Sequence, residues 1–132
     1  MLVEYLVELD HADRVRTFIN RALSDRDVAL AAPDLVFPEA TSALRRLVRL
    51  QKINATEADW AATQLARFPL IAESSRGLIE DAWSMREQMS IYDACYVALA
   101  RRLDGEFVST DGPLVRRLRQ RRERVEFLGD ES

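Results

Sequence analysis

The sequence predicts an α/β fold in which a parallel sheet is flanked by helices. Short apolar segments with the character of strands alternate with longer segments whose apolar residues recur every three or four positions. Strands that alternate with helices in this way are typical of a parallel sheet covered by helices. The chain has 132 residues, of which 48% are hydrophobic, and no repeat or linker divides it. A single domain over 1–132 is therefore expected.

Helices and two short strands are predicted in the first half of the chain. The helices span 2–9, 15–23, a stretch that follows Pro33 and runs to 50, and 56–67. Residues 28–32 are short and strand-like, and 70–72 can form a second, brief strand. Asn54 and Glu57 have the spacing of a capping box, which marks the beginning of the last of these helices.

The second half of the chain is also predicted to alternate between helices and strands. Its helices span 77–88, 90–103 and 113–122, and its strands span 107–110 and 125–128. Pro113 favours the first turn of a helix, because its missing N–H costs nothing there. Binding sites of parallel α/β proteins collect at the carboxyl ends of strands, so acids that follow strands are candidates for function.

Composition favours a cytoplasmic protein without a membrane segment. No stretch is long and apolar enough to span a bilayer, and the first residues carry acids and no basic leader. The single cysteine, Cys95, excludes an internal disulfide, fits a reducing compartment and is expected in the core. His11 is the only histidine, which excludes catalysis by a pair of histidines. Trp60 and Trp83 are expected to pack against other residues rather than to stack on bases.

The net charge of −3 argues against a general nucleic-acid binder, but basic residues gather in two places. One set is Arg116, Arg117, Arg119, Arg121, Arg122 and Arg124, and the other is Arg45, Arg46, Arg49 and Lys52. An acidic body with basic stripes can still attract a polyanion locally. A solvated helix face explains either stripe equally well.

Asp93 is the only charged residue in the apolar segment Ile91–Ala100, which predicts a helix buried on most faces. A lone carboxylate in such surroundings costs several kcal/mol unless something compensates it, and a metal ion would do so. The alternative is structural, because Ser90 as N-cap and Asp93 at the third helical position form a variant of the capping box. Both interpretations remain open at this stage.

Glu39 and Asp111 also stand at predicted helix starts. Glu39 follows Pro38 among apolar residues, and Asp111 follows the predicted strand 107–110. The alternatives are a first-turn acid favoured by the helix dipole for Glu39 and an N-cap for Asp111. If Glu39, Asp93 and Asp111 converge, their mutual repulsion favours Mg²⁺ or Mn²⁺ as a hard counter-charge. Such an ion can activate water for the cleavage of a phosphodiester bond.

The order of several motifs resembles a PIN domain of the VapC type. The motifs are Ala32–Leu35, Pro38–Glu39, Ala43–Arg46, Ser90–Ala100 and Phe107–Asp111, and the opening Leu2–Leu6 also resembles the first helix of that family. The resemblance implies a three-layer PIN fold and a type II toxin that acts as a Mg²⁺-dependent endoribonuclease, with Mn²⁺ as a possible substitute. It also implies an RNA substrate, a cognate antitoxin bound at the cleft, and a homodimer.

The resemblance assigns roles to individual residues. The second acid of the family falls on Glu39, the third on Asp93 and the late acid on Asp111, so these are the predicted catalytic and metal-binding residues. Ser109 takes the place of a hydroxyl residue two positions before the late acid. The basic side chains that could grip RNA phosphates, or an acidic segment of the antitoxin, are Arg116, Arg117 and Arg119.

One departure from the family concerns the beginning of the chain. The family starts with a strand that ends in an Asp, and here Met1 stands where that strand should already have finished. The first ligand Asp has no counterpart, and neither Glu4 nor Glu8 can be assumed to replace it. We expect a longer natural chain, and a truncated, weakly active protein is the alternative.

The missing Asp keeps one rival function open, a PIN-like module that binds an antitoxin peptide or RNA without cutting. A separate alternative is an unrelated helical regulator whose arginine-rich end binds nucleic acid.

Overall fold

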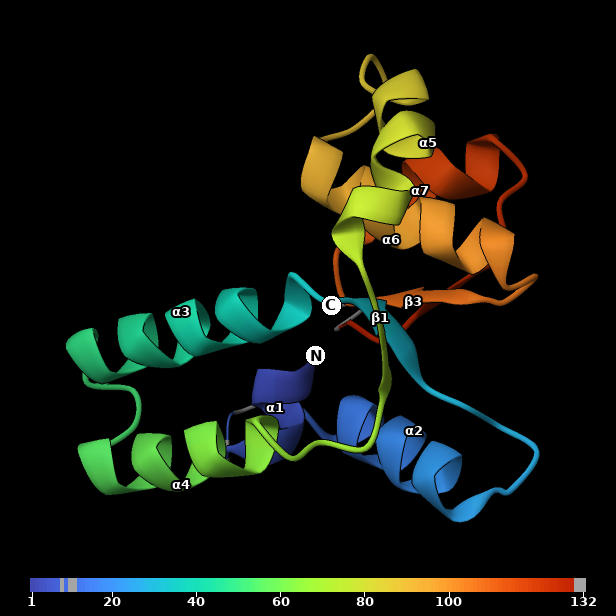
Figure 1. The fold of residues 1–132 in the computed structure, drawn as a ribbon. Coiled ribbons are helices and arrows are strands. Elements are labelled where there is room, and N and C mark those ends of the chain that lie inside the picture. Colours follow the sequence, from blue (N-terminus) through green and yellow to red (C-terminus); the bar gives the residue numbers. More distant parts are fainter. Residues whose placement is uncertain (8, 10–11, 130–132) are drawn as a thin grey trace. The chain divides into compact units, whose positions relative to one another are not determined.

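The computed structural model describes residues 1–7, 9 and 12–129. The elements of the first part are α1 (Leu2–Leu6), α2 (Asp13–Ser24), β1 (Ala31–Pro33), α3 (Val36–Arg49), α4 (Ala55–Leu65) and β2 (Ile71–Glu73). They are followed by η1 (Ser75–Leu78), α5 (Ile79–Ser84), α6 (Ile91–Arg102), β3 (Phe107–Ser109), α7 (Gly112–Gln120) and β4 (Val125–Phe127) (Figure 1). Contacts group the chain into two compact units, Met1–Leu30 with Leu35–Ile71, and Ala31–Asp34 with Ala72–Ser132. We call them the N-terminal and the C-terminal unit.

The predicted α/β class, with parallel strands and flanking helices, is confirmed. β3 and β4 pair in parallel, so that Phe107, Val108 and Ser109 stand opposite Val125, Glu126 and Phe127. Helix α6 contacts β3, and α7 contacts β4. Within the described residues the strands pair two by two, β1 with β2 and β3 with β4, and not in one continuous sheet. The paired strands rule out the all-helical regulator considered from the sequence.

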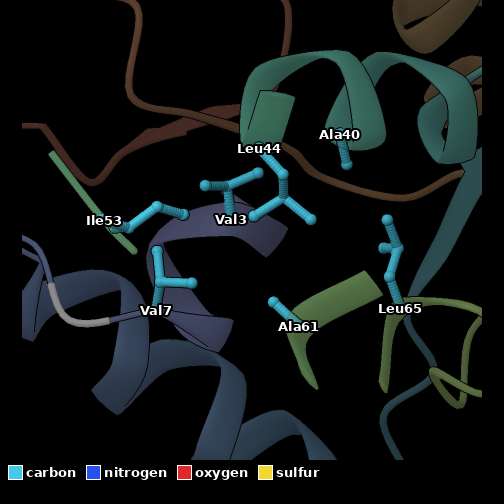
Figure 2. Close-up of a cluster of buried hydrophobic side chains, with 7 residues drawn as sticks. All are labelled: Val3, Val7, Ala40, Leu44, Ile53, Ala61 and Leu65. Atoms are coloured by element: carbon cyan, nitrogen blue, oxygen red, sulfur yellow. The ribbon is translucent and has the colours of Figure 1, made fainter. Parts of the chain in front are cut away.

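The N-terminal unit is held together by an apolar cluster that its helices share. Helix α1 contacts α2, α3 and α4, and α3 lies beside α4 (Figure 1). The buried side chains of the cluster are Val3, Val7, Ala40, Leu44, Ile53, Ala61 and Leu65 (Figure 2). The predicted capping box is confirmed, because Asn54 Oδ1 accepts a hydrogen bond of 2.8 Å from the backbone N–H of Glu57.

The C-terminal unit is built around α6. This helix buries Ala94, Cys95, Val97, Ala98 and Leu99, which confirms the predicted core position of the cysteine. Helix α5 and the 3₁₀ turn η1 contact α6. Helix α7 buries three apolar side chains, Leu114, Val115 and Leu118, which recur at the spacing of one helix face.

Both α6 and α7 end in a residue with left-handed backbone geometry. Asp104 has φ 50° and Arg122 has φ 61°, and the N–H of each residue after them returns to a carbonyl five positions earlier. This is the Schellman arrangement, which satisfies carbonyl groups at the end of a helix. Gln51, with φ 57°, ends α3 in the same way.

Three boundaries differ from the predictions for local reasons. The strand predicted at 28–32 forms at 31–33, because bonds from the N–H groups of Asp27 and Val28 to Asp25 keep the preceding residues in a turn. The helix predicted at 77–88 forms as η1 followed directly by α5 and ends at Ser84, because i to i−3 bonds replace the α-helical pattern after that residue. The first helix ends at Leu6 rather than 9.

The two tryptophans, which were expected to pack against other residues rather than to stack on bases, are both largely exposed. Trp60 is 55% exposed and Trp83 is 59% exposed. The guanidinium carbon of Arg86 lies 4.7 Å from the centre of the Trp83 ring, a cation–π contact. Among the described residues no helix has the length and hydropathy needed to cross a lipid bilayer. His11 lies outside the described residues.

Candidate functional site

Asp111 caps the helix that follows the parallel strand pair. Its Oδ1 accepts a hydrogen bond of 3.1 Å from the N–H of Leu114, and its own N–H donates a bond of 3.0 Å to Ser109 Oγ. Pro113 lies in the first turn, as predicted. The N-cap interpretation is therefore confirmed, and Ser109 holds the backbone that carries the carboxylate. Because an ionised carboxylate has about four acceptor positions, capping leaves room for a cation.

Asp93 lies in the first turn of α6 and is only half-buried. Its N–H donates a bond of 3.1 Å to Ser90 Oγ, which confirms the predicted N-cap. The prediction that this segment is buried on most faces is wrong at its beginning, since Tyr92 is 65% exposed. Water therefore reaches the carboxylate, and desolvation does not by itself demand a metal ion at Asp93.

Glu39 lies in the first turn of α3, where the helix dipole favours an acid. Its backbone N–H donates a bond of 3.1 Å to the carbonyl of Leu35. The side chain is exposed, so the prediction of apolar surroundings that disfavour a free charge is wrong. Its position at a helix start agrees with the sequence prediction.

The three predicted ligands are divided between the two units. Asp93 and Asp111 belong to the C-terminal unit, and Glu39 belongs to the N-terminal unit. Carboxylate oxygens suit Mg²⁺ and Mn²⁺ by their chemistry. Within the described residues, however, no group of three His, Cys, Asp or Glu side chains is placed to hold a metal ion. The convergence of the three acids stays a prediction.

Glu4, the one described acid near the start of the chain that was weighed as a substitute ligand, is engaged elsewhere. Its Oε2 lies 2.8 Å from the terminal ammonium of Met1. Burial alone would raise the pKa of Glu4, but the charge and hydrogen bond of that ammonium outweigh burial and lower the pKa. Glu8, weighed for the same role, lies outside the described residues.

A pocket of about 250 Å³ lies in the C-terminal unit, and neither Asp93 nor Asp111 lines it. Its lining includes the apolar side chains Val97, Ala100, Phe107 and Leu118, and the charged side chains Arg101, Asp104, Arg122, Glu123 and Arg124. Most of these residues lie in or after the last turns of α6 and α7, and Phe107 lies on β3, whereas Asp93 and Asp111 stand at the first turns. The pocket is therefore not the carboxylate site.

Ion pairs at this pocket hold the ends of α6 and β4 in place. Arg101 Nε donates a bond of 2.9 Å to Glu123 Oε1, and this bond raises the pKa of Arg101. Arg124 Nη2 donates a bond of 2.8 Å to Asp104 Oδ1. Four of the charged side chains that line the pocket thus bind one another in two pairs, which gives the pocket a structural role.

Asp34 has a positional role that the sequence did not reveal. Its Oδ1 accepts a bond of 3.1 Å from the N–H of Ser75, and its N–H donates a bond of 2.7 Å to the carbonyl of Glu73. The side chain thereby connects the end of β1 to the beginning of η1. The turn-forming pair Pro33–Asp34 was a signal for a chain reversal, but a partner 41 residues away cannot be read from spacing.

Comparison with known proteins identifies relatives of the chain. No family model matches the sequence. Ribonuclease VapC9 of Mycobacterium tuberculosis is 36% identical over 87 residues, which are 62% of this chain and 65% of the relative. Ribonucleases VapC1 and VapC3 of the same organism are 38% and 32% identical over 88 residues. The chain is similar to VapC ribonucleases over these regions.

The similarity covers only part of this chain and of each relative. The aligned regions cover 63% of this chain and of VapC1, and 67% of this chain and 64% of VapC3. The chain thus spans slightly less than two thirds of the relatives' own length. The predicted resemblance to the VapC type is confirmed, and the α/β architecture of the C-terminal unit agrees with it.

Proposed function

We propose that the chain is the toxin component of a type II toxin–antitoxin system and an endoribonuclease that cleaves phosphodiester bonds of RNA. The observation that carries the proposal is the similarity to VapC9, VapC1 and VapC3, each of which is named a ribonuclease. We further propose that cleavage depends on Mg²⁺, for which Mn²⁺ can substitute.

The proposed ligands of the cation are Glu39, Asp93 and Asp111. Three features support this choice: the carboxylate chemistry, the place of each acid in or just before the first turn of a helix, and the partial or full exposure of each side chain. The proposed role of Ser109 is to orient Asp111 through the hydrogen bond from the Asp111 N–H.

RNA cleavage assays test this proposal. A labelled RNA pool is incubated with the protein in Mg²⁺, in Mn²⁺ and in EDTA, and the fragments are separated by size. Cleavage is expected with either cation and not with EDTA. Asp93→Asn is expected to abolish the EDTA-sensitive cleavage, whereas the matched exposed acid Asp59→Asn on α4 is expected to retain it. Unchanged cutting by Asp93→Asn would contradict the assignment of the site.

A second candidate is a PIN-like module that binds an antitoxin peptide or RNA without cutting it. The capping bond of Asp111, which explains this carboxylate without a metal ion, favours this candidate. RNA that is retained on the protein but never cut, with any divalent cation, would select the module over the nuclease.

The partners belong to the same proposal. We infer a cognate antitoxin that covers the catalytic cleft, a homodimer, and action in the cytoplasm, where RNA is available. Light scattering coupled to gel filtration measures the dimer, and addition of the antitoxin to the cleavage assay measures inhibition. A monomer at all concentrations, or full activity in the presence of the antitoxin, would contradict these inferences.

A further inference from the structure

The outer face of α7 and the turn that follows it carry exposed arginines and no acid. The five exposed side chains are Arg116, Arg117, Arg119, Arg121 and Arg122. In the part of the chain that the structure describes, none of the five forms an ion pair, whereas the nearby Arg101 and Arg124 are paired with carboxylates. We call these five residues the arginine track. Their charges are thus left for an external anion.

The periodicity of α7 keeps the track on one side of the helix. Leu114, Val115 and Leu118 are buried, and the arginines occupy positions between and after them. At a rise of about 1.5 Å per residue, the three steps from Arg116 to Arg119 cover about 4.5 Å of the helix, and Arg121 and Arg122 extend the track beyond the helix end at Gln120. A nucleic-acid strand in a helix has about one phosphate per 3.4 Å, so the helical part of the track matches about two neighbouring phosphates.

The chemistry of the track favours a phosphate backbone over a protein partner. Guanidinium groups bind phosphate through paired, planar hydrogen bonds. Protein interfaces depend on buried aromatic or aliphatic anchors. None of the large apolar side chains that the described residues expose lies between Gly112 and Arg122. Backbone recognition of nucleic acid requires only charge and reach, which the track has.

The position of the track relates it to the proposed cleavage site. Asp111 caps the first turn of α7, and Arg116 follows one turn later on the same helix. A strand that binds along the whole length of α7 would reach the end of the helix that Asp111 caps.

We propose that the arginine track binds the phosphate backbone of single-stranded RNA without reading its sequence. This inference deepens the proposed function, because it names the surface that holds the substrate. Each arginine that contacts a phosphate displaces counterions from the RNA, so the affinity falls with salt in proportion to the number of contacts.

The test measures RNA binding separately from cleavage. Fluorescence anisotropy of a labelled single-stranded RNA is recorded in EDTA over a range of salt concentrations. The track variant combines Arg116→Gln, Arg117→Gln and Arg119→Gln. The control variant combines Arg45→Gln, Arg46→Gln and Arg49→Gln, which removes the same charge from the exposed face of α3. Circular dichroism verifies that both variants fold.

The expected result is a change in the salt dependence of the track variant alone. Three lost contacts at about 0.7 each lower the slope of log affinity against log salt by about 2 for single-stranded RNA. When the salt concentration rises from about 50 to about 200 mM, the affinity of the track variant for RNA is therefore expected to fall about 16-fold less than the affinity of the parent protein. The control variant is expected to keep the parental slope.

Three other outcomes would each contradict either the arginine track, its RNA partner or the proposed nuclease. Equal slopes for both variants would show that total charge governs binding and would refute the track. An unchanged RNA slope with weaker binding of an acidic antitoxin peptide would assign the track to a protein partner. Binding that depends on the track in a protein that never cleaves RNA would leave the track intact and refute the proposed nuclease.

Discussion

Replacement of Asp111 by Asn and by Ala separates its role as a helix cap from its proposed role as a metal ligand. In the structure Asp111 Oδ1 accepts the N–H of Leu114 at 3.1 Å. Asn presents a carbonyl oxygen at the same position and is as good an N-cap as Asp. It has no negative charge, however, and is therefore a weaker ligand for Mg²⁺. Ala removes both the cap and the charge.

The stability effects follow from the capping bond. Asp111→Ala is expected to cost about 1 kcal/mol, the usual value for loss of an N-cap. For a chain of this length, that cost corresponds to a fall in Tm of about 3 to 5 °C. Asp111→Asn keeps the bond and loses only the charge–dipole interaction, which is worth about 0.3 to 1 kcal/mol at an exposed site. Its Tm is expected to lie closer to that of the parent.

The activity effects follow from the charge alone. If Asp111 binds the cation, both variants are expected to lose about 100-fold or more in cleavage rate, since even partners outside the ligand sphere cost about 10 to 100-fold. Thermal melts followed by circular dichroism and initial cleavage rates below both melting temperatures give the two readouts. Parental cleavage by Asp111→Asn would refute the ligand role. A Tm for Asp111→Asn as low as that of Asp111→Ala would refute the cap.

Three further predictions concern local geometry and pH. A Cβ atom at Gly129 would lie 2.8 Å from a backbone carbonyl oxygen of the segment before α7, so Gly129→Ala is expected to cost about 1 to 3 kcal/mol in denaturant titrations; an unchanged midpoint would contradict this. Gln51 has φ 57°, so Gln51→Gly is expected to raise the free energy of unfolding by up to about 1 kcal/mol, and a loss of stability would refute the argument. Burial, together with the hydrogen bond and charge of Glu126, raises the pKa of Glu106. Ionised Glu106 therefore lowers the stability of the fold above that raised pKa, and the effect is absent below the ordinary value of 4.5, where the carboxyl is protonated in both states. Glu106→Gln is therefore expected to raise Tm near neutral pH and to change it little near pH 4; the opposite pH trend in a melting series would contradict the sign.

Predictions from the sequence succeeded where short-range chemistry decides the structure. The capping pair Asn54 and Glu57 and the helix starts at Ser90 and Asp111 were found because each signal lies within four residues of its partner. The alternation of helices and strands was recovered for the same reason, since periodicity is a local property. The positions of the strands were less certain, because only three residues form each of them.

Features that depend on distant partners were not accessible from the sequence. The apolar character of Ile91–Ala100 predicted burial for Asp93, but composition does not reveal that the first turn of α6 remains open to water. The bond between Arg101 and Glu123 joins residues 22 positions apart, and the helix predicted at 77–88 ends early, at Ser84, in turns that its apolar spacing did not reveal.

The carboxylates of the proposed site have a local explanation that is independent of any metal. Asp111 caps α7, Asp93 stands in the first turn of α6, and Glu39 stands in the first turn of α3, where the positive end of each helix stabilises an anion. The same positive end opposes a cation, so a single carboxylate at a helix start is a poor metal site. Cation binding at these positions therefore requires several carboxylates together. The proposed metal site is supported only if cleavage is lost both in Asp93→Asn and in Asp111→Asn, and not by the placement of any one acid.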